Sequence, residues 1–363
     1  MNNDILYYLG FSYFDGIGPM RLKALIAKFG NVQKAYEGNK NELQGILTEQ
    51  LIKEFLVFRS KFDPSKELKT LKEKNIEVIS WEDKKYPPQL KDISDGPICL
   101  YIKGNLKNID FNNDYFIGIV GTRNPTPYGI QITKKFGSEL SRAGFIIVSG
   151  MATGIDTVAH KSALECGGET IAILGCGVDI VYPAINRRLY EDIIQHKGLI
   201  ISEFPPGRLA LKGFFVARNR IISGLSKGVL IIEGLKDSGA LITARYAAEQ
   251  GKEVFASPGP ITSPLSQAPH FLLKQGAKLV TSVEDIFEEL GLRLIPKEKE
   301  HIELQLDSRE KEIFQALQKE SLLVDEIAIQ IKKPVHEVLD IVSILELKDI
   351  IEKNSEGKYQ IKL

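Results

Sequence analysis

Short apolar runs and amphipathic stretches alternate along the chain from about residue 115 to residue 280. The runs are rich in Ile and Val and recur about every 25 to 30 residues, a spacing typical of parallel βαβ units. The predicted strands are Phe116–Val120, Phe145–Val148, Thr170–Leu174, Leu199–Ser202, Val229–Ile232, Glu253–Ala256 and Lys278–Val280. Because they are apolar almost throughout, helices should cover both faces of the sheet. The pattern therefore predicts an α/β fold with a Rossmann-like, doubly wound parallel sheet over residues 81–290.

Residues 1–80 are lysine-rich and helical in pattern. Leu22, Leu25 and Phe29 recur at the spacing of one helix face, and Gly30 is a typical helix stop. Residues 15–19, Asp-Gly-Ile-Gly-Pro, predict a tight turn between two helices, as in helix-hairpin-helix or SAM-like modules. The glycine amides of such a turn can approach a phosphate, but a plain helix–helix turn explains the same residues.

A polar linker, residues 291–307, precedes a C-terminal unit of residues 308–363. Helices are predicted at Ser308–Lys319, Leu323–Ile331 and Val335–Leu347, followed by a hairpin centred on Gly357. Three helices and a hairpin indicate a winged helix, a fold that often binds DNA. Acidic residues lie on or beside the third helix, namely Glu337, Asp340, Glu346 and Asp349. A partner-binding or packing role is therefore as compatible with the sequence as insertion into a DNA groove.

The charges of the 363-residue chain balance, with 47 Lys and Arg against 47 Asp and Glu. Affinity for a polyanion must therefore come from a local patch rather than from the net charge. The three cysteines lack metal-site spacing, which favours a reducing cytoplasm over a disulfide framework or a zinc site. No apolar run approaches the roughly 18 to 20 residues that span a bilayer, so we expect a cytoplasmic protein without a membrane partner.

Glycine turns follow several of the predicted strands, at the edge of the sheet where ligands bind in open α/β folds. They comprise Gly121-Thr122-Arg123, Ser149-Gly150, Gly154-Ile155-Asp156, Gly175-Cys176-Gly177, Ser238-Gly239 and Pro258-Gly259. Backbone amides and helix N-termini at such turns favour phosphate oxygens. The sequence therefore predicts an anion-binding crevice.

Motifs for catalysis or cofactor binding are missing from these turns. Ile180 stands where the dinucleotide fingerprint needs a third glycine, and no phosphate-loop lysine, zinc-protease or nucleophile-elbow motif occurs. His160 and His270 are best interpreted as hydrogen-bonded structural residues. Asp156 and Asp179 are compatible with paired acid–base carboxylates, but Asp after a glycine turn commonly accepts from nearby amides. We assign no catalytic residue, metal or cofactor.

Residues 204–232 contain no acidic residue. The basic residues of this segment are Arg208, Lys212, Arg218, Arg220 and Lys227, and Phe214 and Phe215 lie among them. Cations that meet phosphates beside rings that stack on bases are typical of single-strand binders without sequence preference. In the alternative interpretation the phenylalanines belong to the core and the charges are solvated.

The motifs together resemble those of the bacterial DNA-processing protein A (DprA/Smf) family. The matching residues are Tyr86-Pro87, Gly121-Thr122-Arg123, Tyr128-Gly129, Ser149-Gly150-Met151-Ala152, Gly154-Ile155-Asp156, His160, Gly175, Gly177, Asp179, Tyr182-Pro183, Asn186, Ser202-Glu203-Phe204, Phe215, Arg218-Asn219-Arg220-Ile221-Ile222, Glu233, Ser238-Gly239, Thr243 and Pro258-Gly259. The resemblance covers residues 80–360 approximately. It implies a non-enzymatic protein that binds single-stranded DNA in natural transformation, works beside single-strand-binding protein, loads the RecA recombinase and forms a homodimer.

Carried over by motif, the resemblance implies a set of DNA-binding positions. They are Arg123, Lys212, Phe215, Arg218, Asn219, Arg220, Gly121, Thr122, Gly150, Ser238, Gly239 and Thr243. Three departures from the family pattern occur. Val216 replaces a proline after Phe215, Ala184 replaces a lysine that Arg187 or Arg188 can supply, and residues 267–272, a predicted loop, lack the usual Gly and Asn.

Two alternative functions follow from the same residues. The chain is also compatible with a nucleoside-monophosphate phosphoribohydrolase-like enzyme that uses Glu233, but the glycine–glutamate loop such an enzyme needs is absent, and Pro258-Gly259-Pro260 is the nearest segment. A winged-helix transcription regulator is the third possibility, and the lack of a basic recognition helix counts against it.

Overall fold

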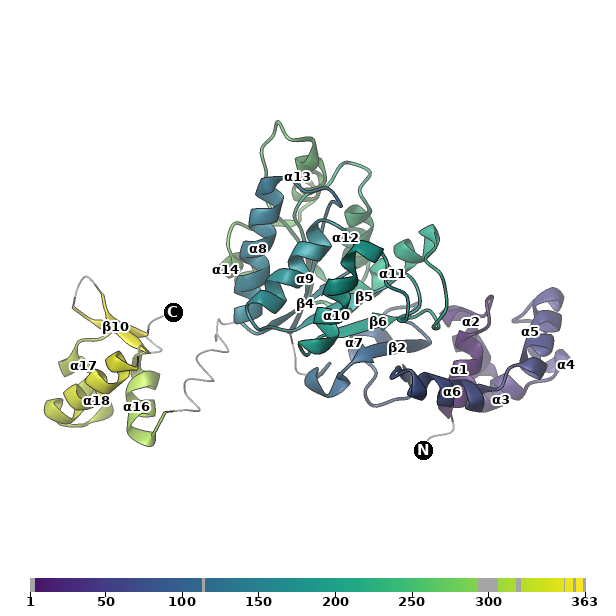
Figure 1. The fold of residues 1–363 in the computed structure, drawn as a ribbon, viewed down its shortest axis with the longest axis horizontal. Helices are drawn as coiled ribbons and strands as arrows, with labels where there is room; N and C mark the ends of the chain where they lie inside the picture. The colour runs from purple at the N-terminus through teal and green to yellow at the C-terminus, as the bar shows by residue number, and fades with distance from the viewer. Residues whose placement is uncertain are drawn as a thin grey trace. The chain divides into compact units, whose positions relative to one another are not determined.

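The computed structural model describes residues 4–112, 115–292, 306–317, 321–348, 350–354 and 357–361. The chain divides into two compact units, Met1–Leu294 and Ile295–Leu363, which are drawn in Figure 1. Most of the predicted linker, residues 293–305, lies outside the described residues, as do residues 318–320 and Asp349. Each unit has its own hydrophobic core.

A nine-stranded sheet forms the centre of the first unit, with strand order β1-β2-β6-β5-β4-β3-β7-β8-β9. Its strands are β1 (Glu77–Ser80), β2 (Cys99–Gly104), β3 (Tyr115–Val120), β4 (Phe145–Ser149), β5 (Thr170–Ile173), β6 (Leu199–Ser202), β7 (Gly228–Ile231), β8 (Glu253–Ala256) and β9 (Lys278–Leu279). Strands β3 to β9 run parallel. They coincide, to within one residue at nearly every end, with the seven predicted strands, so the Rossmann-like α/β fold is confirmed.

The two strands at one end of the sheet, β1 and β2, were not expected from the sequence. β1 pairs antiparallel with β2, with Ser80 opposite Cys99, and β2 pairs antiparallel with β6, with Gly104 opposite Leu199. Residues 77–80, which the sequence analysis grouped with the helical module, therefore belong to the sheet. Both strands are short and isolated from the βαβ repeat, so no periodic pattern indicated them.

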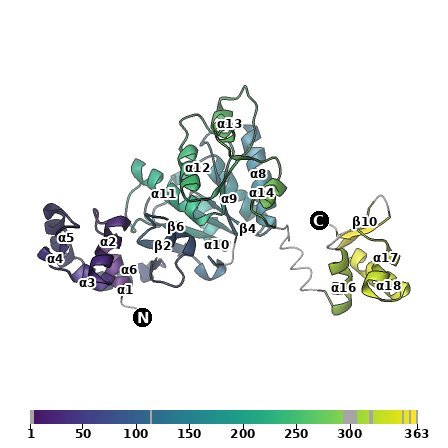
Figure 2. The same cartoon turned by 180° about the vertical axis from the view of Figure 1, so that it is seen from behind.

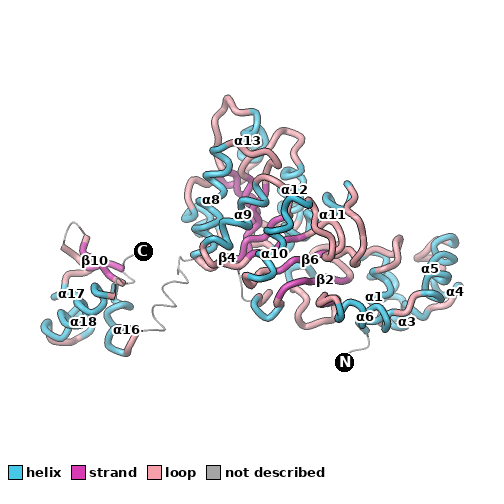
Figure 3. Tube along the Cα trace, in the orientation of Figure 1, coloured by secondary structure: helices cyan, strands magenta, loops and turns pink. Residues whose placement is uncertain are grey.

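Helices cover both faces of the sheet, and the strands lie between them (Figure 3). The helices that follow β2 are α8 (Pro127–Arg142), α9 (Ile155–Glu165), α10 (Arg187–Gln195), α11 (Lys212–Leu225), α12 (Gly239–Glu249), α13 (Gln267–Lys274) and α14 (Val283–Glu289). α8, α9 and α14 pack on Ile117 and Ile119, whereas α11 and α12 pack on Phe116 and Val120 (Figures 1 and 2). Alternate residues of one strand therefore enter opposite cores, as a doubly wound sheet requires. Residues 267–272 lie in α13, so the prediction of a loop there was wrong.

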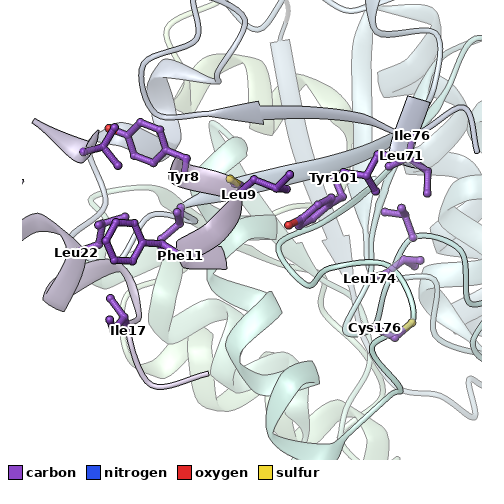
Figure 4. Close-up of a cluster of buried hydrophobic side chains, with 14 of the residues drawn as sticks. Tyr8, Leu9, Phe11, Ile17, Leu22, Leu71, Ile76, Tyr101, Leu174 and Cys176 are labelled. Carbon is purple, nitrogen blue, oxygen red and sulfur yellow. The ribbon is translucent and has the colours of Figure 1, made fainter. Parts of the chain in front are cut away.

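Six short helices form the N-terminal module: α1 (Asp4–Ser12), α2 (Pro19–Phe29), α3 (Val32–Glu37), α4 (Lys40–Leu43), α5 (Glu49–Lys61) and α6 (Pro64–Glu73), and α7 (Pro88–Lys91) follows β1. α2 ends at Gly30, whose φ of 85° is left-handed, as the sequence predicted. The module shares one hydrophobic core with the sheet (Figure 4). Tyr8 and Leu9 of α1 belong to the same cluster as Tyr101 of β2 and Leu174 after β5.

The second unit contains α16 (Ser308–Leu317), α17 (Val324–Ile331), α18 (Val335–Leu347) and an antiparallel hairpin of β10 (Ile351–Lys353) and β11 (Tyr359–Ile361). Its core joins all of these elements, with Phe314, Val342 and Tyr359 buried. The sequence predicted three helices and a hairpin here, and the described residues form them; the winged helix itself stays a prediction.

Candidate nucleic-acid interface

The turns after β3, β4 and β7 are joined by backbone hydrogen bonds at the carboxyl edge of the sheet. The amide of Thr122 donates to the carbonyl of Glu233 at 2.7 Å, and the amide of Ile155 donates to the carbonyl of Thr122 at 3.1 Å. Gly154, at φ 80°, precedes α9, and a Cβ there would lie 2.4 Å from the Thr122 carbonyl oxygen. Only glycine therefore allows these turns to meet.

Arg123 and Lys212 are exposed cations at this edge. Arg123 follows the β3 turn, and Lys212 is the first residue of α11. Within the described residues, neither side chain makes an ion pair or a hydrogen bond. No side chain caps the N-terminus of α11, so the positive end of the helix dipole adds to the charge of Lys212. Both cations are available to phosphate.

Arg218, one and a half turns further along α11, is buried behind this edge. Its Nη1 donates to the carbonyl of Gly150 at 2.6 Å and also contacts the carbonyl of Ile173. A Cβ on Gly150 would lie 2.5 Å from the guanidinium, which explains the glycine at that position. Arg218 thus joins the carboxyl ends of β4 and β5 from within.

Asp156 provides the counter-charge to Arg218. Its Oδ2 accepts from the amides of Gly150 at 3.1 Å and Ala152 at 3.3 Å, which fits the amide-accepting interpretation rather than acid–base chemistry. Burial raises the pKa of Asp156, and Arg218 opposes that shift. Burial likewise lowers the pKa of Arg218 to about 10, against the effect of Asp156.

Arg220 is also buried, in an internal ion pair. Its Nη1 and Nη2 lie 2.6 and 2.8 Å from the two carboxylate oxygens of Glu203, and its Nε lies 2.8 Å from Oδ2 of Asp95. Carbonyls of Asp95 and Ala217 accept the remaining N–H groups. Burial alone would lower the pKa of Arg220, but Glu203 and Asp95 outweigh it and raise the pKa. The prediction that Arg220 contacts DNA does not fit this geometry, because no donor is left for a phosphate.

The side chains of the other two basic residues of the acid-free segment also have partners, although the backbone carbonyl of Arg208 accepts from the amide of Gly177 in one of the glycine turns. Arg208 pairs with Asp15 of the N-terminal turn, with 2.6 Å between Nη2 and Oδ1. Lys227 precedes β7 and lies over the ring of Tyr115, at the amino edge of the sheet. Of the five basic side chains expected to form a positive patch over residues 204–232, only that of Lys212 thus has no partner among the described residues.

Two phenylalanines in the first turn of α11 have different surroundings. The ring of Phe214 stacks on Phe204 with 4.0 Å between centroids. The ring of Phe215 lies against the backbone of Gly175, where a Cβ would come within 2.8 Å of Cδ1. It also lies 5.2 Å from the ring of Tyr182, at 35°. Phe215 is half-buried and Tyr182 is exposed.

The predicted residues around α12 have mixed positions. Ser238 caps the helix by accepting from the amide of Ala240 at 3.2 Å, and Gly239 is exposed. Asn219 reaches the carbonyl of Gly239 at 3.5 Å and accepts from Nε of Arg218. Thr243 is buried, so its predicted place on the surface of the crevice is wrong: it faces the core on the inner side of α12.

The remaining polar residues of the crevice serve the fold. Both carboxylate oxygens of Glu233 accept from Thr126, at 2.9 Å from the amide and 2.5 Å from the hydroxyl. Oδ1 of Asp179 accepts from the amide of Gly207 at 2.8 Å. His160 contacts the hydroxyl of Thr170 at 2.7 Å, and burial lowers its pKa to about 3. Among the described residues, no three His, Cys, Asp or Glu side chains are grouped to hold a metal.

Sequence reasoning missed Tyr182 as a site residue, although its Tyr-Pro pair belongs to the recognised motifs. Its exposure, 46%, could not be inferred from an apolar neighbourhood. The two arginines proposed to replace the lysine absent at Ala184 are both exposed, and Arg188 lies 3.9 Å from Asp192.

None of the helices in the described part of the chain is long and apolar enough to cross a membrane.

Comparison with known proteins gives consistent matches over the sheet. The chain is 40% identical over 309 residues to the protein Smf of Escherichia coli, covering 83% of this chain and 81% of that protein. It is 44% identical over 226 residues to the DNA processing protein DprA of Bacillus subtilis, covering 62% of this chain and 75% of that one.

Two solved structures match as well. The crystal structure of DNA processing protein A from Streptococcus pneumoniae aligns with a TM-score of 0.67 and 35% identity, over 80% of this chain and 98% of that chain. DNA processing protein A from Helicobacter pylori, described for its unique single-stranded DNA binding mode, aligns with a TM-score of 0.53 and 32% identity, over 59% and 95%. The model of the DNA recombination-mediator protein A family matches residues 77–291, the whole of the nine-stranded sheet. The chain therefore belongs to this family, the DprA/Smf proteins.

Proposed function

We propose that the chain binds single-stranded DNA without sequence preference at the carboxyl edge of its sheet. Arg123 and Lys212 take backbone phosphates, and the rings next to Lys212 take bases. The observation that carries the proposal is the first turn of α11, where Lys212 is exposed and Phe215 lies one turn away on the same helix face. The described single-strand binding of the Helicobacter pylori relative supports it.

A titration with labelled oligonucleotides tests this proposal. We expect single strands to bind more tightly than duplex of the same length, and the affinity to fall steeply between two salt concentrations because counterions are released. Lys227→Ala is a matched control, since Lys227 belongs to the same acid-free segment but lies at the amino edge. Equal or tighter binding of duplex would exclude the proposal.

The proposed role requires no catalysis. Glu233 is the residue on which a nucleoside-monophosphate hydrolase would depend, and both of its oxygens are engaged by Thr126. We expect no release of adenine or ribose phosphate from AMP. Release that disappears in Glu233→Gln would support the enzyme instead.

We further propose that the DNA-bound protein acts in the cytoplasm, where it works beside single-strand-binding protein and loads the RecA recombinase during natural transformation. Family membership supports this part of the proposal. The expected result is faster RecA assembly on oligonucleotide coated with single-strand-binding protein when the chain is added. An unchanged assembly rate with normal DNA affinity would reject the loading role alone.

Homodimerisation completes the proposal. A groove of about 550 Å³ between α12 and α13 is lined by apolar side chains, among them Leu241, Phe271 and Leu272, and by the polar side chains of Arg245, Glu253 and Gln275. Phe271 is 46% exposed, and such an exposed ring favours an interface. Phe271→Glu should convert a dimer into a monomer in sedimentation, with Phe29→Leu, in the N-terminal module, as a control. A wild-type monomer at all concentrations would reject this part.

The second unit is not needed for the proposed binding. α18 occupies the place of a recognition helix, yet its thirteen residues include Glu337, Asp340 and Glu346 and no Lys or Arg, which disfavours phosphate contact. A chain ending at residue 292 should keep its single-strand affinity to within about two-fold. A loss of specific duplex binding on truncation would instead support the transcription-regulator alternative.

A further inference from the structure

Tyr182 is the most exposed aromatic ring next to the start of α11. It follows the turn after β5, in a loop that also presents Ile185, and its side chain is 46% exposed. Its hydroxyl makes no hydrogen bond within the described residues. Most other tyrosines of the first unit are tied down: Tyr128 and Tyr190, for example, donate to the carbonyls of Pro258 and Val178. The ring of Tyr182 is therefore presented to solvent without a polar anchor.

Phe215 has a different position from Tyr182, although the two rings touch. The backbone of Gly175 closes one part of the Phe215 ring, and Tyr182 lies 5.2 Å away at 35°. Phe215 is half-buried as a result. A base that approaches from solvent meets Tyr182 more readily than Phe215, and Phe215 supports the outer ring from below.

We propose that Tyr182 is a further base-stacking residue of the single-strand site, on the solvent side of Phe215, whose ring lies 5.2 Å away. This inference rests on the proposed function and adds to it an outer residue that contacts the bases. The ligand is any unpaired nucleobase of a strand whose phosphates lie on Lys212, because stacking on an aromatic face needs no particular base.

The surroundings of Tyr182 favour a base over a protein side chain or a lipid. Ile185, Leu211 and Val216 are exposed apolar neighbours in the chain segments that flank the two rings, and Lys212 supplies a cation one turn from Phe215. No acidic residue occurs from 204 to 232 to repel a phosphate. An apolar surface bordered by an unpaired cation matches the two parts of a nucleotide, the base and its phosphate.

Leucine and phenylalanine substitutions separate ring stacking from apolar bulk. Tyr182→Leu should weaken binding to a dT oligonucleotide at least five-fold with an unchanged salt slope, since stacking contributes about five- to a hundred-fold per base. The loss should vanish on an abasic oligonucleotide of the same length, and Tyr182→Phe should restore binding to within about two-fold. The matched control is Tyr115→Leu, because Tyr115 is a comparably exposed tyrosine, 5.6 Å from Phe145 at 36°, at the amino edge of β3.

A fluorescence measurement tests the contact directly. Trp81 is the only tryptophan, so Trp81→Phe combined with Tyr182→Trp places a single reporter at the site. We expect its emission to be quenched by dT oligonucleotide and not by the abasic strand. Tyr182→Leu that binds dT as tightly as wild type, or a reporter that does not respond to dT, would overturn the inference while the proposed function stood. A wild-type protein that does not prefer single strands would instead overturn the proposed function.

Discussion

The first turn and the middle of α11 carry similar residues and serve different purposes. The first turn presents Lys212 to solvent and Phe215 at half-burial, and nothing in the described chain pairs with the lysine. The second and third turns hold Arg218 and Arg220, and both are buried and fully engaged. One helix thus has an exposed basic end, where we propose that DNA binds, and a structural middle.

The difference shows that the hydrogen-bond acceptors near a basic side chain determine whether it has a structural role or stays available to a ligand. Arg220 finds Glu203 and Asp95, which lie 17 and 125 residues away in the chain, whereas Lys212 finds no acceptor in the parts of the chain that are described. A planar guanidinium suits several fixed carbonyl and carboxylate partners at once. The lysine at the start of α11 is instead a point charge on a flexible side chain. Such a charge suits a strand that binds without sequence preference, because it can meet a phosphate at any position along the strand.

The largest expected effect is on folding, from Arg220→Ala. Removal of the guanidinium leaves Glu203 largely buried without a partner, and the loss of one member of a buried ion pair costs about 3 to 5 kcal/mol. Urea unfolding should show this loss, while DNA affinity per folded molecule and its salt slope stay unchanged. A variant of wild-type stability with weaker, less salt-dependent binding would place Arg220 on the DNA and remove the distinction between the two parts of the helix.

A pH titration of stability probes the same buried region behind the second turn. Burial, followed by Arg218, holds the pKa of His160 at about 3, below its usual 6.5. Below pH 6.5 the unfolded chain therefore binds a proton that the folded chain does not, so stability is complete above pH 6.5 and falls as the pH falls toward 3. The slope is about 1.4 kcal/mol per pH unit. His160→Gln should lack this contribution in urea unfolding at pH 7.5, 5.5 and 4.5; identical slopes in both proteins would contradict it.

Salt slopes sharpen the comparison at the binding surface. Lys212→Ala and Arg123→Ala should each weaken single-strand binding by about 1 kcal/mol at 0.1 M salt. Each should also reduce the salt slope, the magnitude of the slope of log K against the logarithm of the salt concentration, by about 0.7, the value of one phosphate contact on single strands. Arg218→Met should leave the slope unchanged, because its guanidinium is turned toward Gly150 and Ile173. Equal slope changes in Lys212→Ala and Arg218→Met would show that both turns reach the DNA.

The smallest effect is expected at the exposed ion pair of Asp15 and Arg208. Exposed pairs contribute about 0 to 1 kcal/mol, and Asp15 is mostly exposed. The free energy of unfolding of Asp15→Asn should therefore lie within about 1 kcal/mol of the wild-type value. It also frees Arg208, so the salt slope should become steeper by at most about 0.7. An unchanged slope would show that Arg208 is not available to phosphate even when unpaired.

The fold was largely predictable because its signal is local. Apart from Tyr115, the residues of β3 to β7 are buried on both faces, so these strands appear as continuous apolar runs. Gly30 and Pro19 bound α2 where their chemistry predicts. β2 depends on antiparallel pairing with β6, about 100 residues away, and β1 pairs only with β2, so no local pattern encodes this part of the sheet. Residues 267–272 were mistaken for a loop for another reason, because α13 contains Pro269 and has no side-chain cap to mark its start.

The site was predictable in its location and less so in its members. Parallel strands bring their carboxyl ends to one edge, so the glycine turns and Arg123 could be placed from topology alone. Whether Arg218, Arg220 and Thr243 face DNA or the interior depends on burial and on partners distant in sequence. Tyr182 has the opposite property, because its neighbours in the chain are apolar and yet its ring is exposed.

The core shared by the N-terminal helices and the sheet makes their unfolding a single cooperative event. Tyr101 and Leu174 are covered by the same cluster that contains Tyr8 and Leu9, so the helices cannot detach without wetting the sheet. Amide hydrogens of α1 and β2 should accordingly exchange with solvent through the same global opening rather than through separate local ones. The loop before α11 is joined to the N-terminal module by the ion pair of Arg208 and Asp15. The start of α11 should therefore move together with this combined unit.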